Sequence, residues 1–535
     1  MKTMINSIIL ASCLALPLAS CSDSDAAPEQ KDWSTTTYFN SSDAAAQDTY
    51  YKPAVGYVGD PMPFFDPVAG DFKVLYLQDF RPNPEGTYHP IWGVSTKDAA
   101  HYTSLGELVS CGTKKSQDAA IGTGSTIYDE ASKLYYTFYT GNKYLPTGDE
   151  SAQAVMVATS PDFKTWTKDR TFLLKGQDFG YDKNDFRDPF VFKGDDGKFH
   201  MLISTKKGGK GSLAEFVSDD LKNWTDNGVF MTMMWDRFYE CPDLFKMGDY
   251  WYLVYSEIHH AVRRVQYFKG RTLDELKACT ANDVARWPDA HEGFLDSRGL
   301  YAGKTASDGT NRYLWGWCPT RSGKDNTAVG ASPAEPEWGG NLVCYKLIQH
   351  EDGTLTLGQV DAVSEKYNQD VAVEVKESQN MTEADGTYTL AGNAELPDAY
   401  MLMGRLGNHN KISFTVTTTD KWDKFGISMV RGSDSKKYYT MVVNPENENN
   451  RKVNFEEQGV EGKGFIAGID GYVFARPADN VYNITIYTDN SICVMYINDV
   501  CSYTNRIYGI QKNCWSINSY NGANVKVSNL KISQY

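Results

Sequence analysis

One outline recurs five times between residues 60 and 318 of this 535-residue chain. Each copy contains a short apolar strand, a turn rich in Asp, Gly or Lys, and a second strand rich in aromatic residues. The aromatic strands begin at residues 72, 134, 199, 250 and 313, so they are 51 to 65 residues apart. This period exceeds the roughly 40–50 residues of a common propeller blade and leaves room for loops. The repeat predicts an all-β fold with a five-bladed β-propeller over residues 45–350; five unrelated hairpins are the alternative.

Three of the first strands begin with a carboxylate. Asp60 precedes its aromatic strand by 12 residues, Asp188 by 11 and Glu240 by 10, and a proline follows each within two residues. Equivalent strands of a propeller line the central axis, and their equivalent ends meet at one mouth. Burying like charges is costly unless function uses it, so we expect the three acids to form one functional pocket.

Three converging carboxylates suit the cleavage of a glycosidic bond. That reaction needs an acid for the leaving oxygen and a carboxylate on the other face of the sugar. Neighbouring carboxylates should raise the pKa of Glu240 and make it the acid, with Asp60 as the nucleophile. Asp188 should hold ring hydroxyls in the transition state, kept ionised by Arg187. A calcium site and a Ser-His-Asp hydrolase compete, but neither EF-hand spacing nor Gly-x-Ser-x-Gly occurs.

The N-terminal segment predicts export rather than fold. Residues 1–20 have a basic start and an apolar run over 5–18, which is too short to remain in a bilayer. The run ends in Leu18-Ala19-Ser20-Cys21, as in bacterial lipoprotein signals that lipidate the cysteine; an ordinary signal peptide is the alternative. Residues 21–44 are polar and predict a flexible tether. The acidic residues after Cys21 resemble those of Bacteroides-type lipoproteins, so we expect a cell-surface, outer-membrane or periplasmic protein of a Gram-negative bacterium.

Charge and cysteine usage exclude several classes of protein. The net charge of -15 argues against binding to nucleic acid or to an anionic membrane surface, which leaves the N-terminal lipid as the expected membrane contact. Beyond Cys13 and Cys21, eight cysteines remain and none forms a C-x-x-C pair, so no zinc site is expected. Their number permits disulfides, but several lie in apolar strand patterns, where buried free thiols are the simpler interpretation.

The pattern changes after the repeats. Residues 351–368 are expected to be a linker, and residues 369–535 show alternating strands that predict a β-sandwich. Strands are expected at 411–417, 425–430, 438–443, 483–488, 492–497 and 525–532. A structural role for this domain is favoured over carbohydrate binding.

Several segments resemble glycoside hydrolase family 32, the β-fructofuranosidases, inulinases and levanases. Phe186-Arg187-Asp188-Pro189 and the segment 240–245 (ECPDLF) are similar to its RDP and ECPDLF motifs. Its WxNDPNG motif is matched at Asp60-Pro61, but Gly59 replaces the first Asn, and Met62-Pro63 replace the Asn-Gly. Another similar segment is the strand that ends at Gln78. Further ones are 92–98, 123–125, 295–302, 315–317 and 488–499.

The resemblance implies a five-bladed propeller followed by a sandwich, and retaining hydrolysis of fructosides without a metal or an organic cofactor. It implies Gln78, Trp92, Ser125 and Arg187 as substrate-binding residues, and we expect Trp92, Trp315 and Trp338 either to stack on sugar or to pack inside the blades. Levan, inulin, sucrose and fructo-oligosaccharides remain open as substrates, as do exo and endo action and the oligomeric state. A family 43-type arabinosidase or xylosidase and a non-catalytic glycan-binding lipoprotein are the alternatives.

Overall fold

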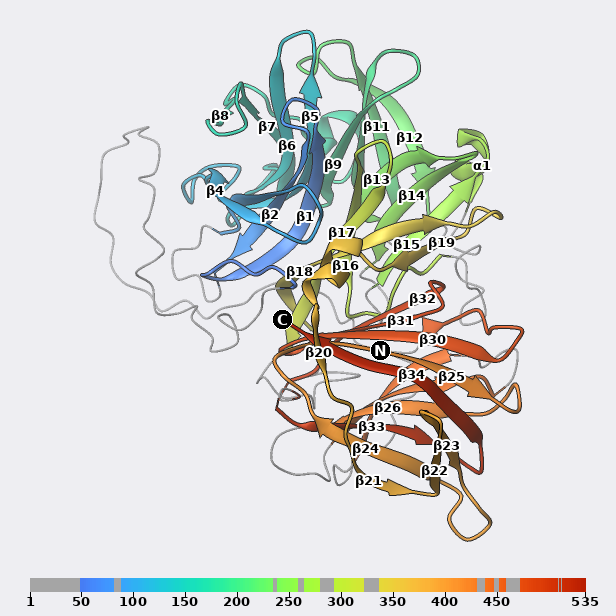
Figure 1. The fold of residues 1–535 in the computed structure, drawn as a ribbon. Coiled ribbons are helices and arrows are strands. Elements are labelled where there is room, and N and C mark those ends of the chain that lie inside the picture. The colour runs from blue at the N-terminus through green and yellow to red at the C-terminus, as the bar shows by residue number, and fades with distance from the viewer. Residues whose placement is uncertain are drawn as a thin grey trace.

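The computed structural model describes residues 49–80, 88–233, 238–257, 264–279, 293–321, 336–430, 438–446, 452–458, 472–508, 510 and 512–535. Two β-rich bodies lie side by side, the first coloured blue to yellow and the second orange to red (Figure 1). The predicted signal peptide, Cys21 and the tether lie outside the described residues. None of the helices in the described ranges has the length and apolar character needed to cross a membrane.

Each of the five sequence repeats forms an antiparallel group of consecutive strands. The first group is β1 (Tyr57–Asp66), β2 (Asp71–Asp79), β3 (Ile91–Thr96) and β4 (Thr103–Val109). The second is β5 (Ala120–Asp129), β6 (Leu134–Asn142), β7 (Gln153–Ser160) and β8 (Thr167–Lys168), and the third is β9 (Phe186–Lys193), β10 (Phe199–Lys207), β11 (Lys210–Ser218) and β12 (Thr225–Thr232). The fourth is β13 (Glu240–Met247), β14 (Tyr250–Glu257) and β15 (Arg264–Gly270), and the fifth is β16 (Tyr301–Ser307), β17 (Arg312–Arg321), β18 (Pro336–Gln349) and β19 (Leu355–Gly358). A short 3-10 helix (Gly176–Phe179) precedes β9, and α1 (Leu273–Ala278) follows β15.

The first strands of the groups lie together at the centre. β1 contacts β5 and β16, β9 contacts β5 and β13, and β13 contacts β16, so these strands close a ring. β1 also pairs with β18, which joins the first group to the last. The aromatic second strands are buried because neighbouring strands and groups cover them. This arrangement is the propeller that the repeat predicts, with the strand starts of the ring at one mouth.

The second body is the predicted β-sandwich. One sheet contains β22 (Met381–Ala384), β23 (Thr387–Ala391), β34 (Asn524–Gln534), β25 (His409–Thr418), β30 (Val481–Asp489), β31 (Ile492–Ile497) and β32 (Cys501–Arg506), with β20 (Gln369–Val371) paired to β34. The other contains β21 (Val375–Gln379), β24 (Ala399–Arg405), β33 (Cys514–Ser519), β26 (Phe425–Val430), β27 (Tyr438–Asn444), β28 (Lys452–Gln458) and β29 (Tyr472–Val473). Apolar side chains of both sheets share one core.

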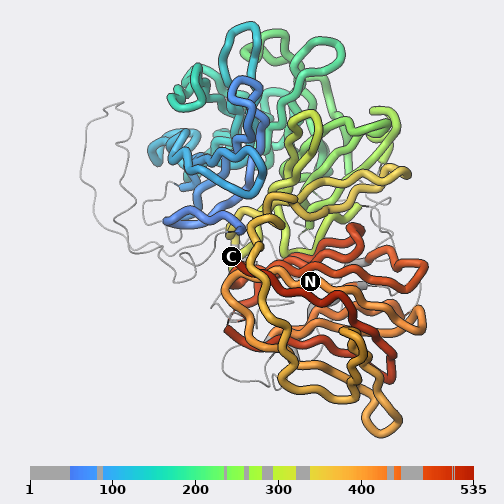
Figure 2. Tube along the Cα trace, in the orientation of Figure 1, coloured from blue at the N-terminus to red at the C-terminus, as the bar shows by residue number. Residues whose placement is uncertain are grey.

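The segment between the two bodies is partly regular. Residues 351–368, expected as a linker, contain β19, which pairs with β18, and α3 (Asp361–Lys366). The end of β34 returns to the junction of the two bodies (Figure 2), where the Tyr535 hydroxyl lies 2.9 Å from Thr49 Oγ1.

Buried polar contacts fix the sandwich against the fifth group. The Asp296 carboxylate accepts hydrogen bonds from the Ser502 hydroxyl (3.0 Å) and from the Thr504 backbone N–H (2.8 Å) and hydroxyl (2.7 Å). The Arg506 guanidinium donates to the carbonyl of Cys318 (2.9 Å). Because breaking such buried bonds leaves polar groups without partners, these contacts hold the two bodies in one orientation.

The eight cysteines beyond Cys21 are all described, and each is a free thiol. Five of them are buried: Cys241, Cys318, Cys344, Cys493 and Cys501. The interpretation of buried thiols rather than disulfides is therefore confirmed for most of them, and Cys111, Cys279 and Cys514 are half-buried.

Candidate active site

Every first strand of the ring has an irregular register against its second strand near its beginning. The shifts lie at Gly59/Met62, Gly122/Gly124, Leu202/Ser204 (opposite residues 187–190), Glu240/Asp243 and Tyr301/Lys304. At this point Asp60, Asp188, Cys241 and Ala302 have positive φ angles of 33°, 58°, 53° and 53°. Such bulges and uncommon φ values are typical of sites where a side chain is aimed for function. These four residues therefore occupy equivalent positions.

Glu240 lies one position earlier than that set. It precedes Cys241, so its equivalents are Arg187, which precedes Asp188, and Tyr301, which precedes Ala302. The prediction that three acids share one equivalent position is therefore wrong for Glu240. The spacing to the aromatic strand is misleading because the turn between the strands varies in length.

At the mouth of the ring, two side chains from neighbouring first strands hold the carboxylate of Glu240 by both oxygens. Arg187 Nη2 donates to Oε1 (2.8 Å), and the Tyr301 hydroxyl donates to Oε2 (2.5 Å). Arg187 itself is held by Asp185 Oδ1 (2.7 Å) and lies 4.0 Å from the centroid of the Phe238 ring. Three first strands thus meet at one partly exposed acid, Glu240.

The next layer inward holds Asp60. The Thr123 hydroxyl donates to Oδ2 (2.6 Å), and the Trp317 indole N–H donates to Oδ1 (3.0 Å). Burial raises the pKa of Asp60, and so does the charge of Glu240, whereas the two hydrogen bonds lower it; the net direction is upward. Asp60 keeps partial exposure, so a ligand at the mouth can reach it.

Asp188 lies in the same layer and is buried. Its Oδ2 accepts a hydrogen bond from the Cys241 backbone N–H (2.9 Å), and its own N–H donates to the Thr140 hydroxyl (2.9 Å). Burial raises the pKa of Asp188 to about 7, although the charge of Arg187 lowers it. The net shift runs against the predicted effect of Arg187, because burial outweighs that attraction.

Comparison with known families agrees with this geometry. Residues 50–360 match the model described as glycosyl hydrolases family 32 N-terminal domain. The chain belongs to glycoside hydrolase family 32. Residues 353–532 match a second model, described as GH32, BT1760-like, C-terminal domain. The resemblance stated from the sequence is confirmed, and the Bacteroides-type lipoprotein remains a prediction.

Individual relatives are distant. A β-fructofuranosidase of Arabidopsis thaliana, insoluble isoenzyme CWINV2, is 26% identical over 311 residues, which are 52% of this chain and 50% of that protein. A sucrose-6-phosphate hydrolase of Vibrio alginolyticus is 27% identical over 220 residues, 39% of this chain and 41% of that protein. The chain thus spans half or less of the length of these curated relatives. The exo-inulinase from Aspergillus awamori shares the fold, with a TM-score of 0.68, 16% identity and coverage of 93% of this chain and 99% of that one.

Two of the predicted substrate-binding residues of this family 32 chain, Arg187 and Ser125, lie in different surroundings. Arg187 lies at the mouth, where it holds Glu240. The Ser125 hydroxyl donates to the Pro189 carbonyl (2.9 Å) and accepts from the Val191 N–H (2.8 Å). Ser125 therefore uses its hydroxyl to join β5 to β9 and is buried.

The other residues that were predicted to contact sugar are either buried inside the propeller or lie farther from the first strands. Gln78 is fully buried, and its amide donates to the Val55 carbonyl. Trp92 lies on the third strand of its group, edge-on to Phe80, two strands or roughly 10 Å out from β1. Trp315 is fully buried in the propeller core. Blade packing is therefore the observed role of Trp315.

Trp338 fills the space beside Gly59, the position before Asp60 where the family motif has Asn. A Cβ added at Gly59 would lie 2.2 Å from a ring atom of Trp338, so the indole occupies the space of a side chain at that position. The indole also stacks on His89, with ring centroids 4.0 Å apart. The side chain that WxNDPNG places there is thus replaced by an aromatic wall from β18.

Sequence reasoning missed Thr123, Tyr301 and Trp317 as partners of the acids. All three lie in segments that resemble the family (123–125, 295–302 and 315–317), and this was the available signal. Within the described ranges, no three His, Cys, Asp or Glu side chains are grouped so as to hold a metal ion.

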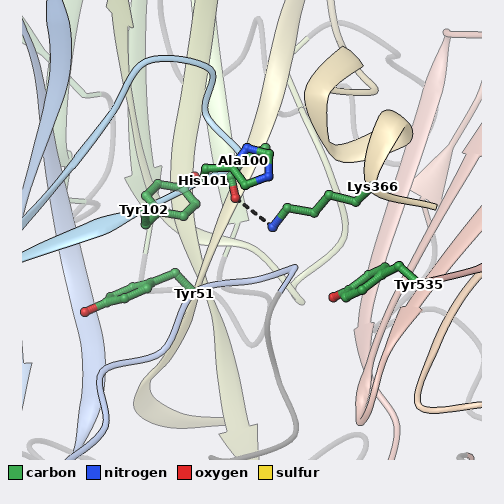
Figure 3. Close-up of a pocket in the computed structure, with 6 residues that line it drawn as sticks. All are labelled: Tyr51, Ala100, His101, Tyr102, Lys366 and Tyr535. Carbon is green, nitrogen blue, oxygen red and sulfur yellow. Dashed lines mark hydrogen bonds between the residues drawn. The ribbon is translucent and has the colours of Figure 1, made fainter. Parts of the chain in front are cut away.

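A separate cavity of about 340 Å³ lies by the loop that follows β3 (Figure 3). It is lined by Tyr51, Ala100, His101, Tyr102, Lys366 and Tyr535. This loop is at the opposite end of the strands from Asp60, since Thr96 pairs with Phe72. Among the described residues, no carboxylate side chain lines this cavity, and glycoside cleavage requires an acid and a nucleophile.

Proposed function

We propose that this family 32 protein is a retaining glycoside hydrolase that cleaves β-fructosidic bonds in fructans such as levan or inulin, in fructo-oligosaccharides or in sucrose. The observation that carries the proposal is the pair formed by Asp60 and Glu240. Each carboxylate is held at both oxygens by named donors, with Glu240 at the mouth of the ring and Asp60 one layer further in. The names of the relatives, β-fructofuranosidase and exo-inulinase, support the same substrate class.

The two acids have complementary roles in the proposed reaction. Glu240 donates its proton to the leaving oxygen while Asp60 attacks C2 of the fructosyl unit, so the glycosidic bond breaks as the Asp60–C2 bond forms. Glu240 then removes a proton from water, which attacks C2 and releases the sugar from Asp60. The product keeps the configuration of the substrate because two inversions occur in sequence.

The neighbouring groups orient these acids. Thr123 and Trp317 fix the two oxygens of Asp60, which leaves the carboxylate with one orientation toward the mouth. Asp188 is proposed to bind ring hydroxyls as charge develops at C2 and so to stabilise the transition state. Arg187, held by Asp185 and stacked on Phe238, places Glu240 and contacts the substrate beside it.

One incubation series tests the function. The purified mature protein is incubated with levan, inulin, sucrose and arabinan, and the products are separated by chromatography. Fructose as the sole product indicates exo action, and a ladder of oligosaccharides indicates endo action. Release of arabinose would contradict the proposal, and glycan binding without any release would favour a non-catalytic lipoprotein.

Two variants serve as matched controls. Glu240→Gln and Asp60→Asn keep the size of the side chains, so each should abolish release while thermal unfolding stays cooperative. Unfolded protein in both cases would indicate a structural cluster of acids instead.

We also propose that the chain is an exported lipoprotein anchored through Cys21. The support is the sequence that ends in Leu18-Ala19-Ser20-Cys21. Labelling of cells with a palmitate analogue should mark the wild-type protein and leave Cys21→Ala unlabelled. Equal labelling of both would contradict the anchor.

A further inference from the structure

His89 lies at the same end of the first group as Asp60. It precedes β3, and the carbonyl of its neighbour Pro90 accepts a hydrogen bond from the Gln78 N–H (2.9 Å). Gln78 pairs with Val58, two residues before Asp60, so this part of the chain between β2 and β3 lies at the mouth of the ring. His89 belongs to none of the segments that resemble the family motifs.

The Trp338 indole connects His89 to the surroundings of Asp60. It stacks on the His89 ring, with centroids 4.0 Å apart and 19° between the ring planes. The six-membered ring of the indole lies against Gly59, the residue before Asp60. The indole also lies 6.0 Å, between centroids, from Trp317, whose N–H donates to Asp60 Oδ1. A single aromatic ring therefore separates His89 from the groups that flank and hold Asp60.

The His89 imidazole has unused hydrogen-bonding capacity. Its side chain is 17% exposed, and Asp79 Oδ1 lies 3.8 Å from Nε2, which is beyond hydrogen-bond distance. In the part of the chain that the structure describes, neither ring nitrogen makes a hydrogen bond. Because largely buried polar groups seldom lack a partner, this imidazole points to a ligand that reaches it from the mouth.

The ring is also held in a fixed orientation before any ligand binds. His89 has a φ of 62°, which is uncommon for a residue other than glycine and typical of functional sites. Trp338 covers one face of the ring, the Tyr88 ring lies perpendicular to it with centroids 4.6 Å apart, and Asp79 lies at one edge. A ligand that used the remaining edge would thus not have to order the side chain first.

The same region lacks a donor that the family motif contains. WxNDPNG has an asparagine where this chain has Gly59, and an asparagine amide offers two N–H donors and an acceptor oxygen. Trp338 fills that space and brings His89 with it. An imidazole carries at least one N–H donor, so His89 supplies the kind of group that position 59 no longer has.

We propose that His89 is a substrate-binding residue that donates a hydrogen bond to a hydroxyl of the fructosyl unit bound against Asp60, and that Trp338 is the positioning residue that holds its ring. This inference rests on the proposed function. Burial raises the pKa of Asp60 and the charge of His89 opposes that rise, in keeping with a short separation between the two side chains.

The first test compares variants of the full-length protein on the fructoside that the incubation series identifies. His89→Phe keeps a ring for the stack on Trp338 but removes both nitrogens, whereas His89→Gln keeps an N–H donor. We expect kcat/KM to fall about three- to tenfold in His89→Phe, the loss of one hydrogen bond, and to fall less in His89→Gln. His101→Phe, at the opposite end of the strands, is the matched control and should leave kcat/KM unchanged.

Three outcomes would overturn the role of His89. One is a kcat/KM of His89→Phe equal to that of the wild type. Another is an active His89→Phe beside an impaired His89→Gln, which would mean that the ring only packs against Trp338. The third is an equal loss in both variants, since a donor would then not account for the loss.

A double variant tests the positioning role of Trp338. Because Trp338 is proposed to act on this contact through His89, adding His89→Phe to Trp338→Ala should lower kcat/KM little further. Fully additive losses would show that Trp338 does not position His89.

A binding measurement separates this inference from the proposed function. If the wild-type protein cleaves no fructoside, the proposed function fails, and calorimetric titration with fructose and with sucrose still tests His89. We expect weaker binding of these sugars by His89→Phe and unchanged binding by His101→Phe. Equal binding by His89→Phe and the wild type, or no binding by the wild type, would overturn the inference.

Discussion

Replacing Asp188 by Asn should stabilise the protein at pH 8 while it removes activity. Burial raises the pKa of this carboxyl from 3.8 to about 7, so the folded state disfavours its charged form. An asparagine keeps an acceptor for the Cys241 N–H, which lies 2.9 Å from the present Oδ2. The substitution thus removes the unfavourable charge and keeps the hydrogen bond.

The size and the pH window follow from the shift. The pKa rises by about 3 units, and each unit corresponds to about 1.4 kcal/mol, which gives an upper limit of about 4 kcal/mol. The folded state binds the proton of Asp188 more tightly than the unfolded state does. The contribution of this proton to wild-type stability is therefore fully present below pH 3.8 and is lost as the pH rises to about 7. We expect a gain for Asp188→Asn between about 1 and 4 kcal/mol at pH 8, and little gain near pH 4.

The assay is thermal unfolding of both proteins at pH 4.5 and pH 8. Asp185→Asn is the matched control, because Asp185 pairs with the same Arg187 (2.7 Å) and with Lys206 (3.1 Å). Burial raises the pKa of Asp185, but these two cations outweigh it and lower the pKa overall. Asp185→Asn should therefore lower the melting temperature at pH 8.

Two results would refute this reasoning. One is a melting temperature of Asp188→Asn that lies below the wild-type value at pH 8. The other is a difference between the two proteins that is the same at both pH values, since a charge effect must shrink as the pH falls toward 3.8.

Three further substitutions test other contacts. Tyr301→Phe removes the donor to Glu240 Oε2, and initial rates should show kcat/KM reduced about tenfold, the equivalent of one hydrogen bond to a charged group. Gly59→Ala should lower the melting temperature because the new Cβ meets the Trp338 ring at 2.2 Å; the loss should be smaller in a Trp338→Ala background, and equal losses would contradict the contact. Asp296→Ala should cost about 3 kcal/mol or more in denaturant unfolding, because it leaves the buried donors of the sandwich without an acceptor; a near-neutral result would show that the junction is not stabilising.

Much of the architecture could be predicted from local patterns. The five repeats gave the strand pairs, since alternating and aromatic runs bounded by Asp–Gly turns form hairpins regardless of what lies around them. The alternating strands after residue 369 likewise predicted the sandwich, and six expected strands match β25, β26, β27, β30, β31 and β34. The motifs around Asp188 and Glu240 identified the family, because each is a short contiguous run.

The tertiary structure decided how the acids relate to one another. Glu240 is one position nearer the mouth than Asp60, which depends on the bulge of each first strand and not on residue counts. Asp188 is governed by burial rather than by its sequence neighbour Arg187, and burial is a property of the closed ring. Ser125 has a motif position that suggested substrate binding, yet its hydroxyl joins two strands.

The same limit applies to contacts between residues that lie far apart in the sequence. Trp338 fills the space beside Gly59, although 279 positions separate them. Sequence patterns fix strands because they depend on near neighbours. Charge, pKa and side-chain space at the mouth depend on which strands meet there, so the trio of Asp60, Asp188 and Glu240 could be named from the sequence but arranged only by the fold.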